Sequence, residues 1–165
     1  MVLNKSLVCK FCSFLCVGFL VLTLSSCFWG NPASQKAKGL VLVNVLDKEH
    51  FDDCSIKGSI NIPFEKVEQD APVLIDKDSE VVVYCSNYMC GASSAARDQL
   101  INMGFKKVYA YEGGTAEWFQ KGYPVQGPSK KSYLIIKMQA PEKKEAVGVI
   151  SAEDLKKKLE ENKKI

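Results

Sequence analysis

The sequence is poor in several features that mark particular classes of protein. Its 165 residues carry a formal net charge of only +3, and His50 is the single histidine. A chain this close to neutral does not suggest a nucleic-acid binder, and one histidine alone supports no catalytic triad. The apolar stretch from Phe11 to Leu24 is shorter than the roughly 20 residues that a spanning helix needs. The composition, with 25% charged and 47% hydrophobic residues, excludes collagen-like, low-complexity and multi-span membrane proteins and predicts one domain with appendages.

Residues 1–26 have the pattern of an export signal. Lys5 and Lys10 give a positive start, and the uncharged stretch Phe11–Leu24 follows, as in a secretory signal peptide. Leu24-Ser25-Ser26-Cys27 then resembles the bacterial lipobox. The resemblance implies cleavage before Cys27, diacylglycerol on its sulfur and acylation of the new amino terminus, and about two acyl chains suffice for stable anchoring. We expect a protein anchored by lipid to a membrane of the bacterial cell envelope, facing the periplasm or the cell exterior. An ordinary signal peptide with a chance cysteine is the alternative.

Two further segments lie outside the predicted domain. Residues 27–38 contain glycine, proline and serine and are typical of a short tether. Residues 128–165 contain ten lysines against six acidic residues. This extension could be attracted to anionic lipid headgroups, or it could simply be a solvated charged surface. Within it, Ser151 is expected to cap a helix whose inner face carries Leu155 and Leu159.

Residues 39–127 alternate between strand and helix patterns. Leu40–Leu46 and Glu80–Tyr84 are aliphatic, β-branched runs, typical of strands buried in a parallel sheet. Shorter strands are predicted at Ser59–Ile62 and Lys107–Tyr111, a helical turn at Phe64–Gln69, and helices at Ser93–Met103 and Thr115–Lys121. This order predicts a single α/β domain with a mainly parallel central sheet flanked by helices.

Cys85 stands where such a sheet binds ligands, at the point where a strand ends and a loop leads into a helix. It directly follows Glu80–Tyr84, and Ser93 begins the next predicted helix. Backbone N–H groups and a helix N-terminus at this place favour a negatively charged sulfur. We therefore expect the pKa of Cys85 to be lowered, which would make it a nucleophile at neutral pH. The alternative is a buried cysteine that acts as a small apolar side chain.

An ordered set of motifs from roughly Val41 to Gln126 resembles a rhodanese domain. The motifs are Phe51 with Ile56-Lys57-Gly58-Ser59-Ile60-Asn61-Ile62-Pro63; Val81 to Cys85; Ser93, Ala96, Leu100, Gly104 and Phe105; and Val108, Glu112-Gly113-Gly114, Trp118 and Gly122-Tyr123-Pro124-Val125. The resemblance implies a sulfurtransferase in which Cys85 takes sulfane sulfur from a small donor, becomes a persulfide and passes the sulfur to a thiol acceptor. It implies neither a metal nor an organic cofactor. The loop residues Ser86, Asn87, Tyr88, Met89, Gly91 and Ala92 would stabilise the sulfur and tune the choice of donor and acceptor.

The chain departs from the family pattern at several places. The usual Asp-x-Arg after the first strand is Asn44-Val45-Leu46, and the usual Gly-His is Cys54-Ser55. The Cys85 loop is longer than the commonest version and lacks its arginine, which argues against thiosulfate as donor. Arg97 could contact an anion in its place, or it could be a solvated helix residue. Related phosphatases close a long loop with an arginine that binds phosphate; Gly91-Ala92 stands there instead, so phosphoryl chemistry is not expected.

Cys90 adds a second thiol to the loop. Cys85, Cys90, Ser93, Ala96 and Leu100 fit a rhodanese-like variant written C-x4-C-x2-S-x2-A-x3-L. Cys90 could resolve a Cys85 persulfide, form a resting disulfide with Cys85, or only shape the loop. Besides the sulfurtransferase, a thiol–disulfide redox protein that uses Cys85 and Cys90 and a non-catalytic binding module remain open.

The segment from Val147 to Leu155 resembles the strand and helix that normally open a rhodanese domain. No such element precedes Leu40. We therefore hypothesise that the C-terminal extension folds back and supplies it.

Overall fold

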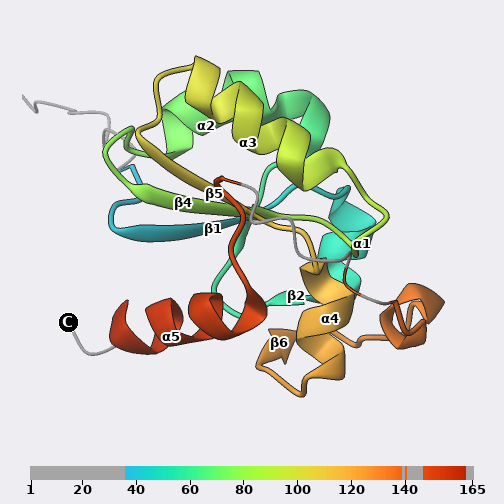
Figure 1. The fold of residues 1–165 in the computed structure, drawn as a ribbon. Coiled ribbons are helices and arrows are strands. Elements are labelled where there is room, and N and C mark those ends of the chain that lie inside the picture. Colours follow the sequence, from blue (N-terminus) through green and yellow to red (C-terminus); the bar gives the residue numbers. More distant parts are fainter. Residues whose placement is uncertain (1–35, 139, 141–146, 163–165) are drawn as a thin grey trace, which may run out of the picture. The chain divides into compact units, whose positions relative to one another are not determined.

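A four-stranded parallel sheet forms the centre of the fold (Figure 1). Its strands, in spatial order, are β3 (Ile60–Asn61), β1 (Leu40–Asn44), β4 (Glu80–Tyr84) and β5 (Lys107–Tyr111). The computed structural model describes residues 36–138, 140 and 147–162, all within the unit Pro32–Ile165. The predicted signal, Cys27 and most of the predicted tether lie outside the described residues.

The two central strands are apolar on both faces. Val41, Val43, Val81 and Val83 pack into one core cluster, and Leu42 and Val82 into the other. Successive side chains of a strand point to opposite faces, so both clusters arise from the same continuous aliphatic runs. The pairing is parallel, with Leu42 opposite Val82. The predicted α/β fold with a mainly parallel sheet is confirmed.

Helices cover both faces of the sheet (Figure 1). α2 (Val67–Leu74) and α3 (Ala92–Asn102) cover one face, where Ala71, Ala96 and Leu100 join the core. α4 (Gly114–Gln120) and α5 (Ala152–Asn162) cover the other, where Trp118 and Leu155 are buried. The carboxyl end of β4 therefore opens between α3 and α4, at the edge where the Cys85 loop begins.

Several short elements are additional to the sequence-based prediction. They are α1 (Lys48–Asp53), η2 (Ser132–Ile135), and β2 (Ser55–Ile56) paired antiparallel with β6 (Val125–Gln126), whereas η1 (Phe64–Lys66) falls within the predicted helical turn. α1 begins at an N-cap, Asp47, whose carboxylate accepts a hydrogen bond from the His50 N–H at 2.9 Å. The predicted helical turn over Phe64–Gln69 is in the structure η1 followed by the longer α2.

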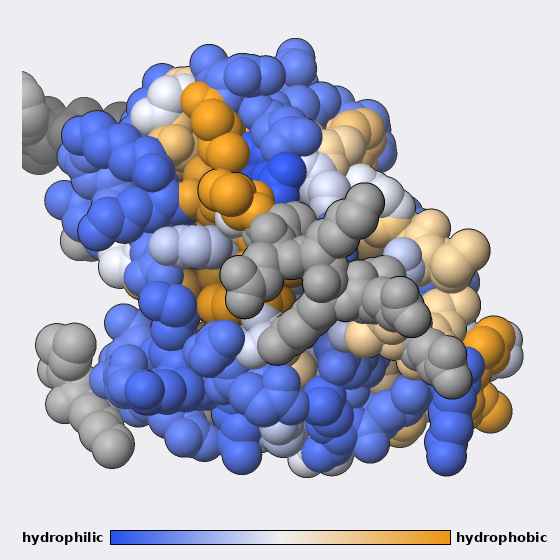
Figure 2. Space-filling model, viewed as in Figure 1, coloured by the Kyte–Doolittle hydropathy of each residue, from blue (hydrophilic) through white to orange (hydrophobic). Residues whose placement is uncertain are grey.

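Residues 147–162 return to the sheet after the gap in the described chain. The Ala110 N–H donates to the Gly148 carbonyl at 2.8 Å, and the Ile150 N–H donates to the Ala110 carbonyl at 3.0 Å. The Asp154 N–H donates to the Ser151 hydroxyl at the start of α5, and Leu155 is 0% exposed. The outer surface of α5 is hydrophilic (Figure 2), so the helix is amphipathic, with its apolar side on the sheet.

At the other end of the domain, Ala37 of the predicted tether is already hydrogen-bonded to the body. Its N–H donates to the Leu74 carbonyl at 2.8 Å, and its carbonyl accepts from the Asp76 N–H at 3.0 Å. Within the part of the chain that the structure describes, every helix is too short or too polar to cross a membrane.

Candidate active site

Hydrogen bonds from the start of α4 fix the backbone of the Cys85 loop. The Thr115 N–H donates to the Cys85 carbonyl at 3.0 Å, and the Thr115 hydroxyl donates to the same oxygen at 3.2 Å. The Ala116 N–H donates to the Ser86 carbonyl at 2.9 Å. Gly114 has φ +60° and lies directly against the backbone of Cys85 and Ser86. These contacts fix the root of the loop between β4 and α3.

The Cys85 sulfur is buried and faces oxygen atoms. The residue is 0% exposed, and its thiol donates a hydrogen bond to the Cys90 carbonyl oxygen, 3.0 Å from Sγ. Sγ also lies 3.5 Å from the Ser93 hydroxyl and 4.0 Å from the Asn87 carbonyl oxygen. A carbonyl oxygen this close stabilises the protonated thiol and opposes the thiolate.

The pKa values of the two thiols of the loop are shifted in opposite directions. The hydrogen bond to Cys90, followed by burial, raises the pKa of Cys85 well above that of an ordinary thiol, although Ser93 opposes this. The side chain of Cys85, together with the N–H groups of Ala92 and Ser86, lowers the pKa of Cys90 to about 5 against the opposing effect of burial. The lowered pKa of the pair therefore falls on Cys90 and the raised one on Cys85, which is the opposite of the direction predicted for Cys85 from the sequence.

The remaining loop residues differ in their exposure. Met89 is 81% exposed, and Gly91 is exposed as well. The Asn87 carbonyl accepts from the Cys90 N–H at 2.9 Å, and its side-chain oxygen accepts from the Met89 N–H at 3.0 Å, which forms a tight turn. Ser86, Tyr88 and Ala92 are half-buried. The loop thus presents Met89 and Gly91 to solvent on either side of Cys90.

Acidic side chains adjoin this loop and were missed by the sequence analysis. Glu117 accepts a hydrogen bond from the Tyr111 hydroxyl at 2.9 Å. Burial and then Glu117 raise the pKa of Tyr88, with a further contribution from Glu112. Glu112 itself accepts from the Ser94 hydroxyl at 2.9 Å. The sequence analysis named Glu112 only as part of the family motif Glu112-Gly113-Gly114 and did not consider Glu117.

A cavity of about 60 Å³ lies between the loop and the segment that follows η2. Asn87 and Tyr88 line it from the loop, and Glu117 and Gln120 line it from α4. The Gln120 amide donates to the carbonyls of Leu134 and Ile136, both at 2.9 Å, and so holds this segment beside the cavity. The hollow offers polar contacts to a small molecule beside the loop residues Asn87 and Tyr88.

Arg97 points toward the returning C-terminal segment. Its guanidinium bonds the Asp98 carboxylate at 2.8 Å and the Val147 carbonyl at 3.3 Å. Its predicted role as an anion contact gains no support from these partners. His50 lies on α1, where its ring bonds Asp47 at 2.8 Å. Cys54 is a third free thiol among the described residues and is 0% exposed.

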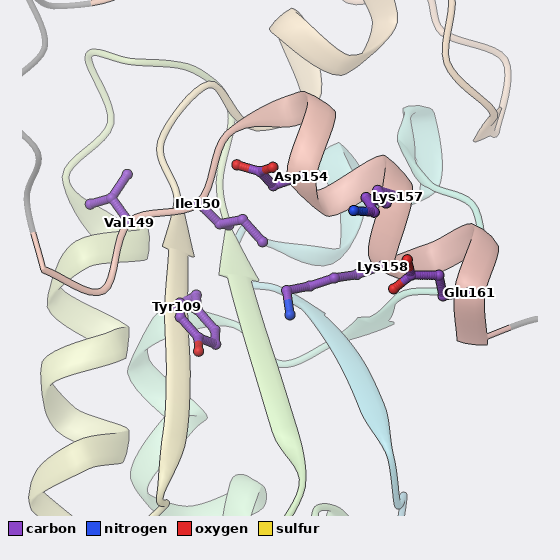
Figure 3. A pocket seen from close by; sticks show the side chains of 7 residues that line it. All are labelled: Tyr109, Val149, Ile150, Asp154, Lys157, Lys158 and Glu161. Atoms are coloured by element: carbon purple, nitrogen blue, oxygen red, sulfur yellow. The ribbon is translucent and has the colours of Figure 1, made fainter.

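A larger cavity, of about 340 Å³, lies between β5 and α5 (Figure 3). Tyr109, Val149 and Ile150 line one side, and the α5 residues Asp154, Lys157, Lys158 and Glu161 line the other. Lys158 is paired with Glu80 at 2.7 Å. Charges of both signs surround this cavity, so it selects neither anions nor cations. Across residues 36–138, 140 and 147–162, no three His, Cys, Asp or Glu side chains gather in a way that could hold a metal ion.

Comparison with known proteins places this geometry in a family. The model of the rhodanese-like domain matches residues 32–121. The thiosulfate sulfurtransferase GlpE of Coxiella burnetii is 29% identical over 83 residues, which are 50% of this chain and 75% of the relative. GlpE of Pseudomonas savastanoi pv. phaseolicola is 33% identical over 95 residues, which are 56% of this chain and 86% of the relative.

Solved structures agree on the fold. The BH2092 protein from Bacillus halodurans superposes with a TM-score of 0.54 at 26% identity, over 61% of this chain and 73% of that one. The Rhodanese_3 like domain of the Alr3790 protein from Anabaena superposes with a TM-score of 0.50 at 26% identity, over 53% of this chain and 99% of that one. The protein belongs to the rhodanese-like domain family.

Proposed function

We propose that this protein is a sulfurtransferase that carries sulfane sulfur as a cysteine persulfide in the Cys85–Cys90 loop. The observation that supports the proposal most is a pair of free thiols, Cys85 and Cys90, in one loop at the carboxyl end of β4, with the pKa of Cys90 lowered and that of Cys85 raised. Relatives named as thiosulfate sulfurtransferases support the reaction class. Cys85 stands at the position that the family resemblance assigns to the carrier.

The reaction needs only thiolates and a sulfur donor. A loop thiolate attacks the outer sulfur of a persulfide R–S–SH, the donor S–S bond breaks, and RS⁻ leaves. The enzyme then holds S–SH on its cysteine. A thiolate acceptor attacks the outer sulfur next, so the acceptor becomes the persulfide and the enzyme thiolate is restored. Each step exchanges one S–S bond for another and consumes no oxidant or reductant.

The surroundings of the loop favour a donor with little negative charge. Glu117 and Glu112 both act on Tyr88, and Arg97 is engaged by Asp98. A carboxylate repels a doubly charged anion such as thiosulfate more strongly than a singly charged or neutral persulfide. We therefore propose a small organic persulfide as donor and a small thiol as acceptor.

Intact-mass measurement after incubation with cysteine persulfide tests the proposal. One sulfur atom should add about 32 Da, and a thiol acceptor should remove it. The double variant Cys85→Ser/Cys90→Ser is the control and should gain nothing. If the wild-type protein gains no more mass than this control, it is not a persulfide carrier.

A thiol–disulfide redox protein is the second candidate function. A specific feature favours it: Cys90, a half-buried thiol of low pKa, lies in the same loop as Cys85, a buried thiol of high pKa that donates to the Cys90 carbonyl, and two unlike thiols this close in the loop are suited to disulfide exchange. This function predicts reversible loss of about 2 Da between the dithiol and the disulfide, without persulfide on either cysteine. A protein that shows neither change would be a binding module on a rhodanese scaffold.

We also propose that the protein is an envelope lipoprotein anchored through Cys27. The support is the sequence alone, namely the apolar stretch Phe11–Leu24 and the lipobox-like Leu24-Ser25-Ser26-Cys27. Such an anchor would place the thiol pair outside the reducing cytosol, where the state of both thiols depends on the local redox poise.

A further inference from the structure

The sulfur of Cys85 faces an oxygen atom that opposes its proposed chemistry. Cys85 is 0% exposed, and its thiol donates to the Cys90 carbonyl oxygen, 3.0 Å from Sγ. A carbonyl oxygen accepts the proton of a thiol but repels a negatively charged sulfur. The proposed sulfur transfer needs Cys85 as a thiolate. The Cys90 carbonyl therefore has to turn away from the sulfur before the transfer begins.

The peptide group between Cys90 and Gly91 can turn over at little cost in hydrogen bonds. It is trans, so the Cys90 carbonyl and the Gly91 N–H point to opposite sides, and a half-turn exchanges their positions. Within the part of the chain that the structure describes, no backbone N–H donates to this carbonyl, and the Gly91 N–H has no acceptor. The turn breaks only the hydrogen bond from the Cys85 thiol, which an ionised sulfur no longer makes.

The hydrogen bonds on either side of this peptide do not involve it. The Cys90 N–H donates to the Asn87 carbonyl at 2.9 Å, which holds the preceding turn. The Ala95 N–H donates to the Gly91 carbonyl at 3.1 Å, which holds the first turn of α3. Both can persist while the Cys90–Gly91 peptide turns, so the movement is confined to one peptide group.

Glycine at position 91 suits this movement and nothing else in the described state. Gly91 has φ −75°, and turning the peptide changes this angle by about half a turn, to a positive value. Glycine adopts a positive φ readily, whereas a residue with a Cβ rarely does. A Cβ at Gly91 would meet no atom within 4 Å. Neither packing nor the present φ therefore requires glycine here, but the turned peptide does.

Few charged groups face the Cys85 sulfur. Cys90 is the titratable group whose charge acts on it. α3 contributes the neutral Ser93 hydroxyl, 3.5 Å from Sγ, and the Asn87 carbonyl lies at 4.0 Å. The strands β1, β4 and β5 and the helix α2 contribute apolar side chains to the core cluster that contains Cys85. A negative charge on this sulfur therefore depends on hydrogen bonds from the loop itself.

We propose that the Cys90–Gly91 peptide turns over when Cys85 loses its proton, and that Gly91 is the positioning residue that permits the turn. The inference rests on the proposed sulfurtransferase function, with Cys85 as the carrier. The thiol proton passes to solvent, the Cys90 carbonyl turns away, and the Gly91 N–H donates to the thiolate. No covalent bond forms or breaks in the turn itself. The peptide returns when the sulfur is protonated again.

Alkylation of Cys85 by iodoacetamide tests the role of Gly91. The full-length protein carries Cys90→Ser, which removes the second titrating thiol of the loop and keeps the backbone carbonyl, and peptide mapping follows Cys85 across the neutral and alkaline range. Adding Gly91→Ala should raise the midpoint by about one unit, which makes alkylation about tenfold slower below it. Gly91→Asn should raise it less, because asparagine enters positive φ more readily. Equal midpoints for glycine and alanine, or equal shifts for alanine and asparagine, overturn the proposal.

Stability measurements separate this effect from damage to the fold. Gly91→Ala should be at least as stable to denaturant as its parent at neutral pH, because the present φ suits alanine and the unfolded chain loses entropy. Gly122→Ala is the matched control, since Gly122 has φ +68° and nothing within 4 Å of an added Cβ. It should lower stability and leave the Cys85 midpoint unchanged. A midpoint that follows stability in both variants overturns the positioning role.

The amide resonance of Gly91 reports the turn directly. In the same Cys90→Ser background, labelled with [15N]glycine, the Gly91 amide proton should move to lower field as Cys85 ionises, because it gains a charged acceptor. It should also become protected from exchange with solvent. Cys85→Ser should show neither change, because a serine hydroxyl does not ionise in this range. A Gly91 amide that does not follow the titration of Cys85 overturns the turn of the peptide.

Sulfur uptake from cysteine persulfide separates the failure of this inference from the failure of the proposed function. Gly91→Ala should take up sulfur about tenfold more slowly than the wild-type protein at neutral pH. Equal rates of uptake overturn the positioning role of Gly91 and leave the sulfurtransferase function standing. A wild-type protein that takes up no sulfur overturns the function, and with it the role of Gly91 in sulfur transfer, even where the amide follows the titration of Cys85.

Discussion

Gly114 at the start of α4 lies so close to Cys85 that a Cβ on its Cα would stand 2.5 Å from the Cys85 carbonyl oxygen. Its φ of +60° is also one that residues with side chains rarely adopt. The close approach lets the Thr115 N–H reach the same carbonyl at 3.0 Å. Gly114, the second glycine of the Gly113-Gly114 pair, therefore allows the start of α4 to pack directly against the backbone of Cys85.

Gly114→Ala should destabilise the domain by roughly 3 kcal/mol, because backbone strain and a backbone clash add together. Gly122→Ala is the matched control, since Gly122 has φ +68° and nothing within 4 Å of the added Cβ. Its cost should be about 1–2 kcal/mol. Denaturant unfolding measures both. Equal losses would mean that the contact with Cys85 does not matter.

The protein should become more stable as pH rises from about 5 toward the ordinary thiol range. The pKa of Cys90 is lowered in the folded state, to about 5, so between these limits the unfolded chain binds more protons than the folded one. The stabilisation is present above the unfolded-state pKa and is lost as pH falls through the folded-state value. Denaturant midpoints measured across this range should rise in the wild-type protein and stay flatter in Cys90→Ser. Parallel curves for the two proteins would contradict a thiolate at Cys90.

Above the pH at which an ordinary thiol titrates, Cys85 should make the folded protein less stable as pH rises. Its pKa is raised in the folded state, so its contribution is present below the unfolded-state pKa and declines as pH rises further. Comparison with Cys85→Ser over the alkaline range isolates this decline.

The C-terminal segment should be needed for stability. Leu155 is 0% exposed and packs with Leu42 and Val82. Leu155→Ala should therefore cost about 2–4 kcal/mol. Val147→Ala is the control, since Val147 is 96% exposed and should change stability by less than about 0.5 kcal/mol. Removing all residues after Gln126 should leave a domain that unfolds or aggregates, and a truncated domain of full stability would reject the hypothesis that the segment completes the fold.

Lipidation should depend on Cys27. Cells grown with labelled palmitate should incorporate the label into the wild-type protein and not into Cys27→Ser, because the cysteine sulfur is the point of attachment. Cys54→Ser is the control for a general effect of removing a thiol. The anchored protein should sediment with membranes and be released by detergent. Equal labelling of Cys27→Ser and the wild-type protein would rule out anchoring at this position.

The sequence was sufficient to predict the parallel sheet, but not the pKa shifts of the two thiols in the loop. Aliphatic runs such as Glu80–Tyr84 predict buried parallel strands directly, and the position of Cys85 at the strand end follows from them. The direction of the Cys90 carbonyl depends on the turn at Asn87 and on where α3 begins. Neither feature can be predicted from the pattern of residues. The sequence analysis did not predict α1 for a related reason. Lys48–Asp53 has no buried residue, so the helix has no apolar periodicity from which it could be predicted.

Replacing Glu117 should change the choice of donor. Glu117→Gln removes a negative charge beside Tyr88 and the small cavity while keeping an acceptor for the Tyr111 hydroxyl. Initial rates of sulfur uptake from thiosulfate should rise relative to cysteine persulfide by roughly fivefold at low salt, because a nearby unit charge is worth about 1 kcal/mol even in water. Salt should reduce the difference. The matched control is Asp78→Asn, which removes a carboxylate just before β4, at the opposite end of the sheet, and should leave the ratio unchanged. A donor ratio that is the same in wild type and Glu117→Gln would show that Glu117 does not select the substrate.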